Sequence, residues 1–184
     1  EPAERHARWL GSFDPAWQAQ LLTADVRAQL TGHDPYAQAR AIWAETRGLD
    51  PLARFLAIDQ RTYLPDDILF KVDRASMMAS LETRAPLLDH RLVAYANGLS
   101  SGMKLKGLTT KHMLKRVAAG YLPDAILKRP KKGFGIPVAK WLRGDLRGTM
   151  TELLAPDRLR AAGLFEPAAV ERLVKEHLDG VRDH

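Results

Sequence analysis

Apolar side chains recur with helical spacing along most of the chain, and the breaks between them carry residues that begin helices. An aspartate followed by a proline occurs three times, at residues 14–15, 34–35 and 50–51. The aspartate can accept hydrogen bonds from the first backbone N–H groups, and proline fits the first helical position, where its missing N–H costs nothing. Three successive helices are predicted, the first two ending near Gly32 and Gly48.

The pattern further downstream predicts more helices and no strand. Proline and capping signals place them at about residues 65–80, 89–97, 110–120, from 137 onward, and 167–178, with a short turn at 122–127. Thr109 or Thr110 is expected to cap the third of these, and Asp89 the second. The helix at 65–80 is expected to bury Ile68, Leu69, Val72, Ala75 and Ala79. No segment alternates apolar and polar residues for long enough to indicate a strand. The predicted fold class is all-α, as a single helical domain over residues 1–184.

Composition narrows the possible functions. The chain has no cysteine, which excludes disulfides, thiolate metal sites and a cysteine nucleophile, and its six histidines show no zinc-binding spacing. There is no run of 18 apolar residues and no signal peptide, so we expect a cytoplasmic protein without a membrane segment. Lys and Arg exceed Asp and Glu by six, which favours anionic partners such as phosphates or nucleic acid. Because the chain begins at Glu1 rather than at a methionine, we expect it to be a piece of a longer polypeptide.

The most cationic stretch reads KRPKKGFG, at residues 128–135. Four cations in five positions precede a Gly-Phe-Gly hinge, an arrangement suited to a loop that closes over a ligand. A lysine in such a loop could bind a triphosphate or pyrophosphate as a point charge. A solvated turn is an equally good interpretation. The stretch fits neither the GxxxxGK[ST] nor the GxGxxG phosphate motif.

A second charged stretch contains Asp66, Asp67, Asp73 and Arg74, within YLPDDILFKVDRAS. Helical geometry places Asp66 and Asp73 on one face, and Asp67 and Arg74 on another. A carboxylate near an arginine can accept hydrogen bonds or act as a base. The simpler interpretation, that the first two aspartates neutralise a helix end while Asp73 and Arg74 are solvated, is favoured on the pattern alone.

Two further charges, Glu82 and Arg84, follow that helix. Pro86 biases the backbone before it towards an extended form, in which residues two apart point to the same side. The two side chains could form a clasp at the helix end or line a cleft, and the spacing does not decide between these.

Taken together, these segments resemble a known family. YLPDDILFKVDRASMMASLETRAPLLDHRLVAYA, followed by KLKGLTTKHMLKRVAAGYLPDAILKRPKKGFGIPVAKWLRGDLR, is similar to the C-terminal part of glutamine-dependent asparagine synthetase and its amidotransferase relatives. The resemblance covers about residues 49–148, in collinear order. It implies a helical segment of a synthetase domain of the adenine-nucleotide α-hydrolase (ATP-pyrophosphatase) type. The α/β half of that domain, with its SGGxDS loop, and the glutaminase domain with its cysteine nucleophile are not in this sequence.

The resemblance also implies a reaction and a set of residues. The family activates aspartate with ATP and Mg²⁺, releases pyrophosphate, and lets glutamine-derived ammonia displace AMP. Lys131 matches the family lysine that stabilises the transition state of adenylate formation, with Lys132 beside it. Asp67, or alternatively Asp66, is expected at the substrate end of the cleft, and Glu82 near the reacting groups. Asp73, Arg74 and Arg84 match positions around the cleft.

The sequence leaves alternatives open. The acceptor could be another carboxylate, as in amidotransferase relatives, and a homodimer is compatible with the sequence. A basic helical module that binds nucleic acid through KRPKKG is the alternative from another functional class. No metal ligands are assigned within this chain, so Mg²⁺ is expected to be held mainly by the absent half.

Overall fold

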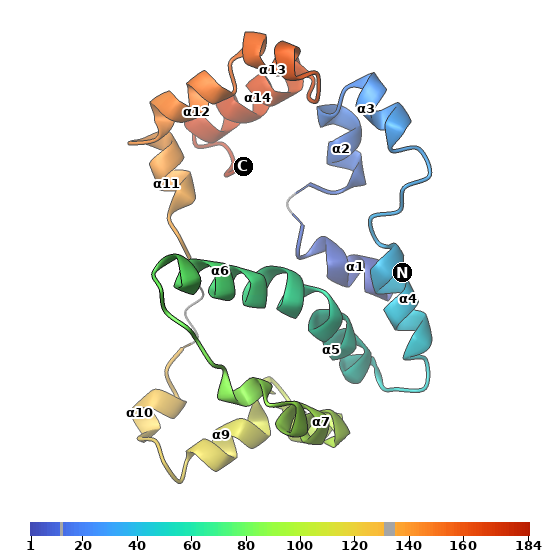
Figure 1. Ribbon diagram of the computed structural model, residues 1–184, viewed down its shortest axis with the longest axis vertical. Helices are drawn as coiled ribbons and strands as arrows, with labels where there is room; N and C mark the ends of the chain where they lie inside the picture. Colours follow the sequence, from blue (N-terminus) through green and yellow to red (C-terminus); the bar gives the residue numbers. More distant parts are fainter. Residues whose placement is uncertain (12, 131–134) are drawn as a thin grey trace. The chain divides into compact units, whose positions relative to one another are not determined.

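The computed structural model describes residues 1–11, 13–130 and 135–184 (Figure 1). Helices dominate it, and the two strands found in the described residues have two residues each, which confirms the all-α prediction. The chain forms two compact units, each built from two separate segments: Glu1–Leu10 with Pro35–Lys131, and Gly11–Asp34 with Lys132–His184. The single domain over residues 1–184 stays a prediction. None of the described helices is both long and apolar enough to cross a membrane.

The first unit has its core where three helices meet. These are α1 (Pro2–Arg8), α4 (Ala37–Glu45) and α5 (Pro51–Arg61). Ala3, Ile42 and Ile58 are at most 1 % exposed, and Trp43 packs against them from the side. Asp50 caps α5, because its side chain accepts hydrogen bonds from the backbone N–H groups of Leu52 and Ala53. The small residue Ala3 lets the short helix α1 approach the other two closely.

Most of the remaining first unit is helical but has no core of its own. Its elements are η1 (Leu64–Leu69), α6 (Phe70–Met78), η2 (Pro86–Leu88), α7 (His90–Gly98), α8 (Ser101–Lys104), β1 (Leu105–Lys106), β2 (Thr109–Thr110), α9 (His112–Ala118) and α10 (Asp124–Leu127). Figure 1 labels α6, α7, α9 and α10. None of residues 61–130 is buried. The expectation that α6 and its preceding turn bury five apolar residues is therefore wrong: Ile68 is half-buried, and Leu69, Val72, Ala75 and Ala79 are exposed.

Two polar contacts tie this part to the core helices. The side-chain amides of Gln60 and Asn97 exchange two hydrogen bonds, at 2.9 and 3.0 Å, and so join α5 to α7. The Ser101 hydroxyl donates to the Asp50 carboxylate at 2.6 Å. This bond is the main reason why the pKa of Asp50 is lowered, with the Ala53 N–H contributing next.

The second unit has a separate core. Its helices are α2 (Pro15–Leu21), α3 (Ala24–Gln29), α11 (Val138–Arg143), α12 (Arg147–Leu153), α13 (Pro156–Ala162) and α14 (Pro167–Leu178). Leu21, Leu159, Val170 and Leu173 form the buried cluster, which joins α2 to α13 and α14. Backbone hydrogen bonds reinforce the join, since Glu166 N–H donates to Leu21 C=O at 2.8 Å and Thr23 N–H to Leu164 C=O at 3.1 Å.

A buried histidine secures the end of this unit. His177, on α14, is 2 % exposed. Its Nε2 lies 3.2 Å from the Ala139 carbonyl oxygen of α11, and its Nδ1 accepts a hydrogen bond from the His184 backbone N–H at 3.1 Å. The imidazole thus links α11, α14 and the C-terminal residues. His184 in turn contacts Glu176, with 2.7 Å between Nε2 and the carboxylate.

The helix boundaries test the capping signals individually. Asp14, Asp50 and Asp89 cap their helices as predicted, and α14 has the predicted bounds. Asp34 is not the residue that directly precedes α4, because this helix begins at Ala37 with Tyr36 before it.

Two further boundaries correct the predictions. The first predicted helix is interrupted after Leu21, where extended backbone at Leu22 and Thr23 separates α2 from α3. Thr109 and Thr110 lie in β2, which pairs with β1 in an antiparallel hairpin, and Lys111 precedes α9 instead. This hairpin also departs from the expectation of a chain without strands.

Candidate functional site

The acidic pair lies on an unusual helical turn. Residues Leu64–Leu69 form a π-helical segment that carries Asp66 and Asp67 and continues directly into α6. Wider π-helical turns are rare and occur frequently at functional sites. Asp67 lies 3.3 Å from the Nζ of Lys71, one turn further along, in an exposed ion pair. The nearest cation of Asp67 in the described residues is thus Lys71 rather than Arg74.

Asp73 and Arg74 lie in the first half of α6, and both are exposed. The guanidinium of Arg74 lies over the Phe70 ring, 5.3 Å from its centroid. In the described residues, no ion pair or side-chain hydrogen bond involves the carboxylate of Asp66 or Asp73. These two carboxylates are therefore accessible to a cation or an N–H donor from elsewhere.

Glu82 and Arg84 form an ion pair with each other. The backbone between α6 and η2 is irregular, with Ala85 extended at φ −101° and ψ 98°, so the two side chains reach the same side as expected. Both are well exposed, at 67 % and 86 % of their side-chain surface. The contact is a clasp, which is one of the two arrangements that the sequence left open.

The lysines assigned to phosphate, Lys131 and Lys132, lie outside the described residues, as do Gly133 and Phe134. The part of the basic stretch that is described begins with Lys128, which pairs with Asp124 at 2.6 Å on α10. Arg129 is exposed and has no side-chain partner among the described residues. Of the basic stretch, the structure therefore places only the N-terminal side.

The ion pair of Asp89 and Arg91 was only partly predicted from the sequence. Asp89 caps α7 as predicted, but its carboxylate also accepts two hydrogen bonds from the Arg91 guanidinium, at 3.1 and 2.9 Å. These bonds, with the Arg91 backbone N–H, lower the pKa of Asp89, and Asp89 raises the pKa of Arg91. The two-residue spacing after a capping aspartate could have indicated this bidentate contact.

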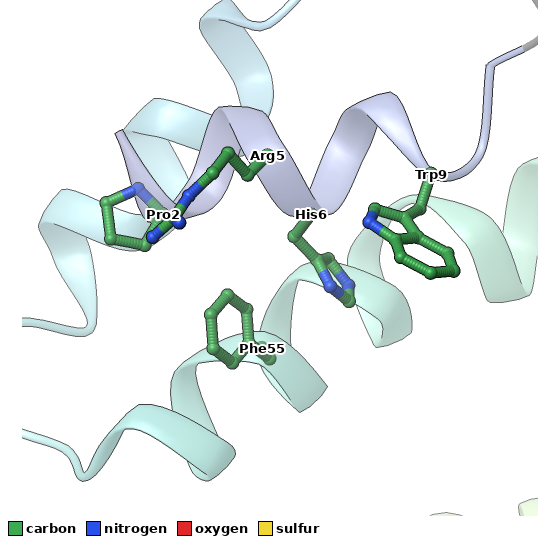
Figure 2. Close-up of a pocket in the computed structure, with 5 residues that line it drawn as sticks. All are labelled: Pro2, Arg5, His6, Trp9 and Phe55. Carbon is green, nitrogen blue, oxygen red and sulfur yellow. The ribbon is translucent and has the colours of Figure 1, made fainter.

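A pocket was also missed by the sequence analysis. It has a volume of about 330 Å³ and is lined by Pro2, Arg5, His6, Trp9 and Phe55, with the His6 ring between those of Phe55 and Trp9 (Figure 2). His6 Nε2 lies 2.6 Å from the Asp59 carboxylate. Because none of the predicted site residues lines this pocket, it is separate from the charged set described above.

The predicted residues share one property: those that are described are exposed and lie in residues 61–130. Asp67 and Glu82 each contact a neighbouring cation, and no described hydrogen bond or ion pair joins the η1–α6 charges to Glu82 and Arg84. The described residues also contain no group of three or more His, Cys, Asp or Glu side chains able to hold a metal ion. The described contacts therefore do not join these charges into one site.

Comparison with known proteins identifies the family to which these charged residues can be related. The model of the asparagine synthase family matches residues 2–184. A Mycobacterium tuberculosis protein, provisionally named a glutamine-hydrolysing asparagine synthetase, is 40 % identical over 144 residues, which are 78 % of this chain and 22 % of that protein. Glutamine-hydrolysing asparagine synthetase 1 of Bacillus subtilis is 31 % identical over 133 residues, 70 % of this chain and 21 % of its own length.

The similar proteins also include some that are not named as asparagine synthetases. A Penicillium rubens protein named amidase chyE is 26 % identical over 138 residues, 71 % of this chain and 20 % of its own length. In all three cases the matching segment is about a fifth of the relative. No solved structure matches the chain.

Proposed function

Because this chain belongs to the asparagine synthase family, we propose that it is part of the synthetase domain of a glutamine-dependent asparagine synthetase. The observation that carries the proposal is the family match across residues 2–184, which includes every charged residue singled out above. The family uses ATP, and in the proposed reaction ATP and aspartate are the substrates and glutamine is the ammonia source. The chain alone is expected to be inactive, because it corresponds to about a fifth of its relatives' length.

The proposed chemistry has two steps. A β-carboxylate oxygen of aspartate attacks the α-phosphorus of ATP, the bond to pyrophosphate breaks, and β-aspartyl-AMP forms. Ammonia then attacks the acyl carbon, AMP leaves with the bonding electron pair, and loss of a proton from nitrogen gives asparagine. Negative charge gathers on the phosphate oxygens in the first step, so a cation placed there accelerates it more than it strengthens substrate binding.

We assign roles to this chain's residues on that basis. Lys131 is proposed to stabilise the developing charge and the departing pyrophosphate, with Lys132 as its neighbour. Asp67, with Asp66 as the alternative, is proposed to face the substrate end. Glu82 is proposed to contact the reacting groups, positioned by its ion pair with Arg84. Asp73 and Arg74 are proposed to line the site.

Mg²⁺ would neutralise phosphate charge when bound. We propose that its ligands lie mainly in the rest of the polypeptide.

The test uses the polypeptide encoded by the whole reading frame. Aspartate-dependent release of pyrophosphate from ATP is expected in the wild type, and Lys131→Ala should lower kcat at least 100-fold, as removal of one charge-stabilising group typically does. Lys175→Ala, at an exposed lysine on α14 and outside residues 61–130, is the matched control and should retain full activity. Undiminished release by Lys131→Ala would reject the assigned role.

A second function is favoured by the fungal relatives named amidases. An amidotransferase that acts on a carboxylate other than aspartate would retain the ATP chemistry and change only the acceptor. It predicts that pyrophosphate release depends on a carboxylic acid in the assay, but not on aspartate. Comparing release with aspartate and with a panel of other carboxylic acids separates the two functions.

A further inference from the structure

The chain exposes more surface than folded bodies of its size normally do, and none of residues 61–130 is buried. The whole chain has 14016 Å² of accessible surface. Even two separate compact bodies with the lengths of the two units would expose only about 10,600 Å² together. Both buried cores lie outside residues 61–130, and this stretch is called here the uncovered segment.

The exposed side chains of the uncovered segment are strongly apolar. They include Phe70 at 59 %, Met77 at 56 %, Met78 at 90 %, Leu87 at 60 %, Tyr95 at 67 % and Leu108 at 101 %. Single exposed apolar residues are ordinary, whereas a gathering of large ones over several consecutive elements marks an interaction surface. The uncovered segment therefore has the exposed apolar side chains that are typical of an interaction surface.

Its charge is equally distinctive. Residues 61–130 contain twelve Lys and Arg against six Asp and Glu, so the whole net charge of +6 lies in this segment and the rest of the chain is balanced. A surface that covers it is expected to combine apolar side chains with negative charge, because complementary potentials favour association and like charges oppose it.

The helix α6 shows how covering would affect the site. Phe70, Asp73 and Met77 are spaced by three and four residues, so they lie on one face of the helix. Burying Phe70 and Met77 would enclose the Asp73 carboxylate, which has no partner in the described residues. An enclosed, unpaired carboxylate is costly, so the covering surface must also bring a cation or N–H donors to Asp73.

We propose that the uncovered segment is the docking surface for the remaining part of the synthetase domain in the same polypeptide, and that this part supplies a donor group to Asp73. The inference rests on the proposed function, and it identifies the occupant from length: relatives that match this chain are about five times the length of the matched segment. A stable interface of this kind buries roughly 800 Å² on each side, which the exposed apolar residues can provide.

Methionine oxidation tests the proposal without any substitution. Met77 and Met78 are side chains that dilute hydrogen peroxide converts to sulfoxide at a rate set by access. In the polypeptide from the whole reading frame, the peptide that contains both should be oxidised at least tenfold more slowly than in the same polypeptide unfolded in urea. A native rate within twofold of the unfolded rate would overturn the docking proposal, as would a reading frame without further synthetase sequence.

Substitutions on the surface and the effect of dilution identify the occupant. Phe70→Asp should restore fast oxidation of Met77, and the milder Phe70→Ala should restore part of it, whereas Val181→Asp, at a 75 % exposed residue outside the segment, should not. Protection lost on dilution, together with a dimer in sedimentation, would identify a second copy as the occupant and overturn the proposal. Retained protection with no aspartate-dependent pyrophosphate release would reject the proposed function alone.

Discussion

Replacing His177 with alanine tests how the second unit is held together. The imidazole is 2 % exposed, so the substitution leaves a cavity on the buried face of α14 and removes the contacts to Ala139 and His184. A lost buried hydrogen bond leaves its partner unsatisfied at about 1–3 kcal/mol, and cavities of this kind add to the cost. Because the C-terminal partner reaches solvent more easily, we expect a total of about 2–4 kcal/mol.

That loss is large for a body of this size. Globular units are stable by about 0.05–0.15 kcal/mol per residue, which gives roughly 4–12 kcal/mol for the second unit. Urea unfolding, monitored by hydrogen exchange of the α14 amides, reports on this unit separately from the first. The urea concentration at the midpoint should be clearly lower in the variant than in the wild type.

A matched control uses the same substitution at a surface histidine. His33 is exposed, and in the described residues its side chain has no hydrogen-bond partner. His33→Ala should change the free energy of unfolding by less than about 0.5 kcal/mol. If His177→Ala were equally mild, the linking role of the buried imidazole would be refuted.

Three other substitutions test the first unit. Arg54→Ala removes a guanidinium that lies 3.5 Å from the Trp43 ring centroid and donates to the Trp43 carbonyl oxygen; we expect about 1.5–3 kcal/mol less stability to urea, and less loss with Arg54→Lys. Asp89→Asn removes the charge that pairs with Arg91. Folding lowers the pKa of Asp89, so the ionised carboxylate stabilises the folded state above the usual carboxyl pKa near 3.8. This stabilisation is lost as pH falls through the lowered pKa. Thermal unfolding of wild type and Asp89→Asn should therefore differ at pH 7 and converge in strong acid, and a constant difference would contradict this reasoning. Glu82→Ala should change the free energy of unfolding by less than about 0.5 kcal/mol, yet lower pyrophosphate release by the whole polypeptide. A matching loss of stability and of pyrophosphate release would mean that Glu82 has a structural role.

Local signals predicted the helix starts well where one residue decides them. Asp14, Asp50 and Asp89 cap their helices because the side-chain oxygen and the N–H groups it accepts from are neighbours in sequence. At Asp34 the same dipeptide fails, since the chain makes a further turn before α4 begins. The π-helical turn at Asp66 and Asp67 had no signal, because its backbone differs from an α-helix without demanding particular residues.

Burial was harder to predict, for a physical reason. The apolar spacing of α6 correctly indicates a helix with an apolar face, but spacing does not tell whether the surface that covers this face belongs to the same chain. Ile58 and Val72 are both apolar residues on helices, yet Ile58 is 1 % exposed and Val72 44 %. For the candidate site, the two-residue spacing predicted that Glu82 and Arg84 point to the same side, but it did not decide whether they pair with each other. The roles of Asp67 and Asp73 stay predictions, because they depend on groups outside this chain.

The discontinuous make-up of the second unit has a consequence for biosynthesis. Leu21 leaves the ribosome roughly 140 residues before Leu159 and the helix that follows it, which at 5–20 residues per second is a delay of roughly 7–30 s. During that time the apolar face of α2 has no native partner, while α1, α4 and α5 can already assemble. The nascent chain is therefore expected to need a chaperone most between the completion of α5 and the synthesis of α14.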